Sequence, residues 1–180
     1  MDTTDPDAML ETRARRAYEM GRLRHAARLA PFVVVAGGAA LACGRPLLPT
    51  AVLTCVLLPL CVGVSFAGGP AGRGVVPGLL AGAAALAMPL LISTVGHACF
   101  GDACMRLCLP ACVVGGGIAG GVIAKLAVRH ERDPRFLGAA LAVTALTGAL
   151  GCTVSGAFGV LGMLAGVLAA GAPLLVVARR

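Results

Sequence analysis

Six apolar stretches, each about 15 to 23 residues long, occupy most of this chain and limit what it can fold into. They cover residues 30–44, 47–66, 75–96, 107–128, 136–151 and 156–178. At 1.5 Å per residue, helices of this length cross or nearly cross the ~30 Å hydrocarbon core of a bilayer. The chain is 58% hydrophobic and 13% charged, whereas soluble domains are about 45–50% apolar and about 25% charged. We therefore predict an all-α integral membrane protein with a bundle of six transmembrane helices over residues 30–180.

Turn-forming or charged residues separate the six stretches and predict where the chain reverses direction. The breaks fall at residues 44–46, 68–74, 98–103, 129–135 and 151–156. The last break has the weakest turn signal. A single helix over 136–178 would nevertheless be roughly 64 Å long, about twice the hydrocarbon core. The chain must therefore fold back near residue 151.

Residues 1–29 form a separate, charged segment that we predict to be a cytoplasmic amphipathic helix. Asp5 followed by Pro6 is typical of an N-cap and a first helical position. The first apolar stretch begins too far from Met1 for a cleavable secretory signal, so we expect it to be retained. The helix could rest on anionic lipid headgroups or dock a cytoplasmic protein. The residues that we expect to contact such a partner are Leu10, Arg13, Arg16, Ala17, Met20, Leu23 and Arg24.

The placement of basic residues predicts the orientation of the spans, because cytoplasmic loops are enriched in Lys and Arg. With six spans, only Arg45 and Arg106 of the fifteen basic residues lie on one side. We therefore predict a bacterial inner-membrane protein with both termini cytoplasmic, and we interpret the net charge of +7 as topology rather than direct nucleic-acid binding. The other side holds Arg13, Arg15, Arg16, Arg22, Arg24, Arg28, Arg73, Lys125, Arg129, Arg132, Arg135, Arg179 and Arg180.

Several function classes lack the residues that they require. No Asp or Glu lies in any of the six stretches, whereas proton-coupled carriers need buried carboxylates or a His relay at mid-depth. The sequence also has no phosphate-binding Walker loop, no G-x-S-x-G and no H-E-x-x-H. We therefore do not expect an enzyme or an ion-coupled transporter.

Cysteine is the most informative residue type, with eight in the chain. Four of them, together with His97, lie in a window of 16 residues that the predicted topology puts at the third, outward loop. Cys43 and Cys152 fall at the outward ends of the first and fifth stretches. A soft-metal site, for zinc or a similar ion, would use His97, Cys99, Cys104, Cys108 and Cys112. A redox or sensing set would consist of Cys43, Cys99, Cys104, Cys112 and Cys152.

The residues alone leave four interpretations of these cysteines open. Two disulfides could staple the outer ends of the bundle in an oxidising compartment, with Cys99 and Cys104 as one plausible pair. Thiolates with an imidazole could bind a soft metal. Cys104 lies near Arg106 and a predicted helix N-terminus, which favours a reactive thiolate. Cysteine is also a small hydrophobic residue, which is our expectation for Cys55 and Cys61.

The chain resembles the NrsF-type and CarR-type polytopic anti-sigma factors. The resemblance lies in the number of short spans, in the charged N-terminal helix and in three local segments. These segments are Cys108-Leu109-Pro110-Ala111-Cys112, the basic loop ending at Asp133 to Ala139, and Thr147 to Cys152. The resemblance implies that outward cysteines sense oxidative or heavy-metal stress, with Cys112 or Cys108 and Cys152 as the sensing thiols. It also implies that residues 5–28 hold a sigma factor.

These observations predict a membrane-bound sensor and regulator, most specifically an anti-sigma factor. An alternative is a small transporter of soft-metal ions that is similar to the mercuric-ion membrane proteins. A less favoured alternative is a membrane thiol–disulfide oxidoreductase. The sequence has no C-x-x-C pair and few aromatic residues to form a quinone site.

Overall fold

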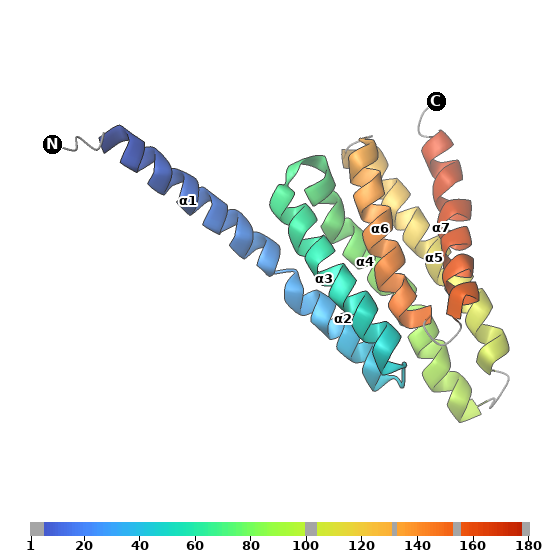
Figure 1. Ribbon diagram of the computed structural model, residues 1–180. Coiled ribbons are helices and arrows are strands. Elements are labelled where there is room, and N and C mark those ends of the chain that lie inside the picture. Colours follow the sequence, from blue (N-terminus) through green and yellow to red (C-terminus); the bar gives the residue numbers. More distant parts are fainter. Residues whose placement is uncertain (1–5, 100–103, 131–132, 153–155, 178–180) are drawn as a thin grey trace.

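The computed structural model describes residues 6–99, 104–130, 133–152 and 156–177, and every element within them is an α-helix (Figure 1). Side chains are described for residues 10–11, 13–91, 110–128, 133–152 and 159–173. The helices are α1 (Pro6–Ala27), α2 (Ala30–Ala42), α3 (Leu47–Ala67), α4 (Gly69–Cys99), α5 (Cys104–His130), α6 (Pro134–Cys152) and α7 (Gly156–Val177). Each predicted apolar stretch overlaps one of the helices α2 to α7. The predicted all-α class is therefore confirmed.

Among the described residues, five helical segments are long and apolar enough to cross a membrane. They are Arg13–Ala42, Leu47–Ala67, Gly69–Leu91, Pro110–Val128 and Pro134–Cys152. A further apolar segment in α7, Gly159–Pro173, is shorter. This set of helices is compatible with a multi-pass membrane protein.

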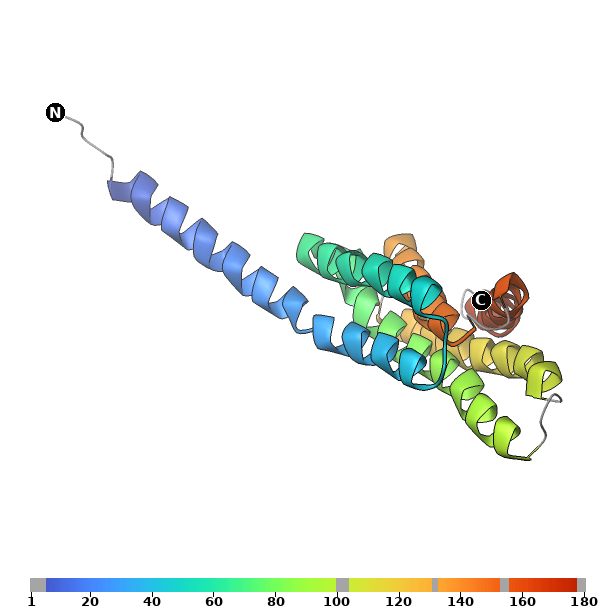
Figure 2. The same ribbon diagram turned by 60° about the horizontal axis from the view of Figure 1, so that its bottom comes forward.

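The first segment that is long and apolar enough to cross a membrane combines α2 with residues 13–27 of α1. α2 has 13 residues, so its length of about 20 Å is too short to cross the hydrocarbon core alone. α1 continues in nearly the same direction as α2 in both views (Figure 2). Pro31 lies at the start of α2 and lacks the N–H that a continuous helix would use, so the helix is interrupted at Arg28 and Leu29. The predicted first stretch, 30–44, overlaps the second part of this segment.

Glycines lie in the two reversals that the structure describes in full. Gly44, with φ of 76°, follows the end of α2. Gly68 and Gly69 have φ of 72° and 66° and reverse the chain between α3 and α4. Residues with a Cβ atom rarely adopt such positive φ angles. α4 begins at Gly69, so the predicted break at 68–74 is too long, because residues 69–74 are helical. Two consecutive glycines complete the turn, and Pro70 is tolerated in the first helical turn.

The bundle is held together by two close helix pairs, α4 with α6 and α5 with α7. A Cβ atom on Gly78 would lie 2.7 Å from the Ala140 carbonyl oxygen, and one on Gly82 would lie 2.6 Å from the Thr147 Cβ. Thr144 Oγ1 also donates a 3.0 Å hydrogen bond to the Gly78 carbonyl. Glycines spaced four apart thus let the α4 and α6 backbones approach closely within one chain.

The alternating helix directions give the bundle two distinct ends. The α2–α3 turn, the ends of α4 and α6, and the starts of α5 and α7 lie at one end, which we call the cysteine end because Cys43 and Cys152 lie there (Figure 1). The α3–α4 turn, the end of α7 and α1 lie toward the other, the α1 end. α4 and α5 extend beyond the other helices at the cysteine end in both views.

Candidate functional site

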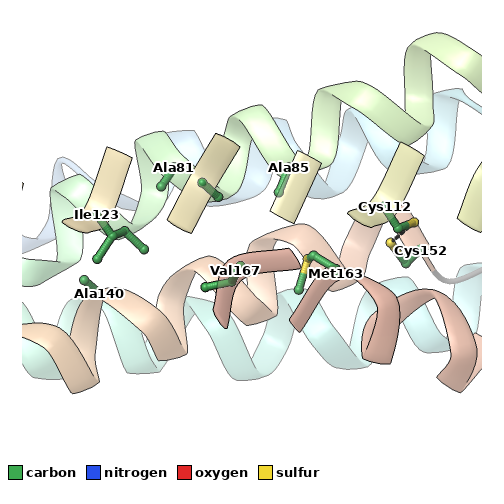
Figure 3. Packing of buried hydrophobic residues seen from close by; sticks show 9 residues of the cluster. Ala81, Ala85, Cys112, Ile123, Ala140, Cys152, Met163 and Val167 are labelled. Atoms are coloured by element: carbon green, nitrogen blue, oxygen red, sulfur yellow. Dashed lines mark hydrogen bonds between the residues drawn. The ribbon is translucent and has the colours of Figure 1, made fainter. Parts of the chain in front are cut away.

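Two cysteines from different helices meet at the cysteine end. The Sγ atoms of Cys112 in α5 and Cys152 in α6 lie 2.7 Å apart, although 40 residues separate them in the sequence (Figure 3). Both side chains are fully buried, within a cluster that also contains Ala85 and Met163. The structure therefore brings together two residues of the predicted redox set.

Small residues around Cys152 allow this close approach. A Cβ atom on Gly151 would lie 2.8 Å from Pro89 Cγ in α4, and one on Gly148 would collide with the Met163 sulfur in α7. The last turn of α6 can therefore press against α4 and α7 only because it lacks side chains at these positions. On the α5 side, Gly115 similarly contacts Ala85. Together these contacts fix the register that places Cys152 opposite Cys112.

The distance between the sulfurs favours thiol–disulfide chemistry over metal binding. Two thiolates on one tetrahedral zinc ion, each at about 2.3 Å, would lie about 3.8 Å apart. The observed 2.7 Å is shorter, so a metal would have to push the helices apart. Among the residues that the structure describes, no three His, Cys, Asp or Glu form a group that could hold a metal ion. The Cys112–Cys152 pair is thus suited to a two-electron redox step.

The other predicted metal and redox residues are distributed around the same end. The side chains of His97, Cys99, Cys104 and Cys108 lie outside the described residues, so the predicted metal set and the Cys99–Cys104 pairing stay predictions. The backbone of α5 begins at Cys104, so positions 104, 108 and 112 occupy one stripe of a single helix. Cys43 is half-buried at the end of α2. Cys61 is buried in the second apolar cluster and Cys55 is exposed.

The predicted partner-binding face of α1 is open to its surroundings. All seven residues of this face, Leu10, Arg13, Arg16, Ala17, Met20, Leu23 and Arg24, are exposed. Leu10, Met20 and Leu23 retain 63%, 57% and 49% of their accessible surface. By contrast, Ala26 is fully buried where α1 approaches the bundle. The face is therefore available for binding, since about half or more of the surface of each of these three apolar side chains stays accessible.

An arginine that the sequence pattern did not single out attaches α1 to the bundle. The Arg22 guanidinium donates a hydrogen bond to the carbonyl oxygen of Phe66, in the last turn of α3. It also lies 5.3 Å from the centre of the Phe66 ring and 5.7 Å from that of Tyr18. The last carbonyls of a helix lack partners within the helix, and a cation there is favoured by the helix dipole. Arg22 thus caps α3.

A second arginine, Arg45, is buried at the cysteine end, with 6% of its surface accessible. It donates a 3.3 Å hydrogen bond to the Pro89 carbonyl, so it links the α2–α3 turn to α4. Pro89 is also the residue that contacts Gly151, next to Cys152. The distribution of basic residues marks Arg45 as one of two on the predicted outward side, but it does not predict the burial of Arg45 or its contact with Pro89.

A scan against protein-family models and searches of curated proteins and of solved structures found no match for this chain.

Proposed function

We propose that this chain is a six-span inner-membrane sensor and regulator, an anti-sigma factor that holds a sigma factor through α1 and responds to oxidants through Cys112 and Cys152. The observation that carries the proposal is the 2.7 Å separation of the two buried sulfurs. The 13:2 distribution of basic residues supports cytoplasmic termini. The resemblance to polytopic anti-sigma factors supports the choice of a sigma factor as the partner.

The sensing step is the oxidation of two thiols by a peroxide. One thiol loses its proton, and the resulting thiolate attacks a peroxide oxygen to form a sulfenic acid; the leaving hydroxide or alkoxide takes up that proton and departs as water or the corresponding alcohol. The second thiol then attacks that sulfur, so the disulfide forms and one water leaves. The two electrons lost by the sulfurs reduce the O–O bond. Because both side chains are fully buried, a small oxidant suits this pair better than a protein oxidant.

The packing of α6 provides a physical connection from the thiols to α1. Leu150 and Val143 of α6 belong to the same buried cluster as Val33 and Ala40 of α2. α2 in turn continues into α1 across the short interruption at Arg28 and Leu29. A disulfide that shifts the end of α6 would therefore change packing against the helix that carries α1. A bias of a few kcal/mol between two arrangements is enough to switch partner binding.

The exposure of α1 favours a protein partner. α1 has 22 residues, and most of the stability of helices in proteins comes from packing of an apolar face against a partner. Leu10, Tyr18 and Met20 are exposed on it, which is the arrangement expected of a helix that docks into a groove of another protein.

The proposal is tested in two steps on the full chain in membranes. Peroxide should convert Cys112 and Cys152 to a disulfide, detected by mass spectrometry after the remaining thiols are alkylated. Cys112→Ser or Cys152→Ser should abolish both this product and the release of the captured sigma factor. Cys61→Ser is the matched control, because Cys61 is also fully buried but belongs to the other cluster. We expect it to respond like the parent.

Two results would contradict the proposal. The first is an unchanged response to peroxide when Cys112 and Cys152 are both replaced. The second concerns the partner: affinity capture should recover a sigma subunit with the full chain and lose it when residues 1–26 are deleted. Equal recovery with and without that segment would remove the anti-sigma function and leave the thiol pair as a separate device.

A further inference from the structure

A groove of about 490 Å³ lies between α1 and α3. One wall is formed by α1 and the other by the last part of α3. The lining residues are Arg16, Glu19, Met20, Leu23, Val62, Gly63 and Phe66. α1 diverges from α3 in both views (Figure 1, Figure 2), so the groove opens away from the bundle.

When α3 spans the membrane, its length puts the α3 wall of the groove at the boundary of the hydrocarbon core. α3 has 21 residues, so its length of about 32 Å matches the ~30 Å core. Val62 and Gly63 therefore lie about one turn inside the boundary, and Phe66 lies near it. A segment of a soluble protein would have to enter the hydrocarbon to contact Val62, whereas a lipid chain is already there.

The α1 wall changes from apolar to basic as it leaves the bundle. Leu23 and Met20 lie nearest to the bundle, and Arg16 lies farther out along the helix. Glu19 on the same wall forms an ion pair with Arg15 at 3.3 Å, which balances its charge. Arg16 forms no ion pair with another residue in the described part of the chain. An apolar inner section below a basic outer section is complementary to a phospholipid with a negatively charged headgroup.

We propose that this groove binds one anionic phospholipid. An acyl chain lies between the apolar residues of α1 and α3, and the headgroup phosphate contacts the Arg16 guanidinium. The groove shares Arg16, Met20 and Leu23 with the predicted partner-binding face, so a bound lipid and a bound partner would compete for these residues. The lipid site itself does not require a sigma factor, since it needs only that α3 crosses the membrane.

The chain contains no tryptophan, so a single introduced tryptophan reports on the groove. Phe66→Trp keeps an aromatic ring beside Arg22. The full chain with this substitution is reconstituted in vesicles of phosphatidylcholine and phosphatidylglycerol, in which an equal small fraction of one lipid or the other is brominated. Brominated phosphatidylglycerol should quench the fluorescence about fivefold more effectively than brominated phosphatidylcholine, because one arginine–headgroup contact contributes about this factor.

Two pairs of variants test the headgroup and chain contacts separately. Arg16→Gln should remove the preference, whereas Arg13→Gln, an equal change of charge outside the groove lining, should retain it. Gly63→Leu should fill the groove and reduce quenching by phosphatidylglycerol, whereas Gly38→Leu should not. A Cβ atom on either glycine would have no neighbour within 4 Å, so both variants should fold.

Three outcomes would overturn the proposal. Equal quenching by the two brominated lipids would show ordinary contact with the bilayer. Absence of quenching by both would place the groove outside the lipid and favour a protein segment as its occupant. A preference that survives both Arg16→Gln and Gly63→Leu would locate the anionic lipid elsewhere on the protein.

Discussion

At the scale of single residues, glycine determines how the helices of this protein approach one another. The spacing of Gly78 with Gly82 and of Gly116 with Gly120 is visible in the sequence, and it predicts close packing of helix backbones. The structure adds the partners: Gly116 and Gly120 face the backbone of Met163 and Val167 in α7. The spacing alone cannot name these partners, because the same pattern serves contacts within one chain and between two copies.

We expect Gly116→Ala and Gly120→Ala to destabilise the bundle by about 1–3 kcal/mol each, the usual cost of overpacking. Their new Cβ atoms would collide with backbone atoms of α7, which cannot rotate away as a side chain can. Gly121→Ala is the matched control on the same helix, since nothing lies within 4 Å of its Cβ position. It should be neutral or slightly stabilising. Thermal unfolding in detergent measures the three effects, and equal midpoints for Gly116→Ala and Gly121→Ala would contradict the assigned α5–α7 contact.

The contact between Cys112 and Cys152 could not be predicted from the spacing of the cysteines alone. The concentration of cysteines drew attention to positions 97–112, but the described pair joins this window to Cys152, 40 residues beyond Cys112. That contact depends on the register of α5 against α6, which Gly148 and Gly151 set through contacts with α7 and α4. Such a register follows from three-dimensional packing. The resemblance to anti-sigma factors, rather than the spacing of the cysteines, implied Cys152 as a sensing residue.

At the scale of elements, the helices were predictable because the length and hydropathy of each stretch limit where a helix can lie. α3, α6 and α7 begin and end within two residues of the predicted 47–66, 136–151 and 156–178. The contact between α1 and the bundle could not be predicted in the same way. The contact of Arg22 with Phe66 joins residues 44 apart, and no periodic pattern marks either one.

We expect Arg22→Ala to loosen α1 from α3 without unfolding the bundle. The substitution removes a hydrogen bond to a helix-terminal carbonyl and two ring contacts, which together should contribute about 1 kcal/mol at this half-exposed site. Amide hydrogen exchange in the last two turns of α1 should become roughly fivefold faster. Arg24→Ala, an exposed neighbour on the same helix, should leave exchange unchanged. Equal acceleration by both variants would mean that the effect is loss of charge and not loss of the α3 contact.

At the scale of the whole molecule, short connections and alternating helix directions sort the chain into two ends. The α3–α4 turn, near Arg73, lies toward the end that carries α1, and the helix ends nearest to Asp102 lie at the other end. The membrane side of each end depends on the distribution of basic residues, since the helices alone define no inside or outside.

We expect reporter fusions at Arg73 and Arg129 to be active as cytoplasmic reporters and a fusion at Asp102 to be active as an outward reporter. The positive-inside rule gives this orientation, because thirteen of the fifteen basic residues then face the cytoplasm. Paired phosphatase and fluorescent-protein fusions at the same three sites provide the measurement. A cytoplasmic result at Asp102 would put the cysteine end in a reducing compartment and remove the proposed sensing function.

α1 and α2 together form a nearly continuous rod, so a change of its direction at the bundle would displace the far end of α1 most. α1 has 22 residues and is therefore about 33 Å long. A change of about 10° in its direction, with Ala27 as the fulcrum, displaces Pro6 by about 6 Å but Leu23 by only about 1 Å. Small rearrangements in the bundle are thus magnified along the rod. A protein bound near Leu10 would therefore undergo most of this displacement, whereas a molecule bound near Leu23 would move by only about 1 Å.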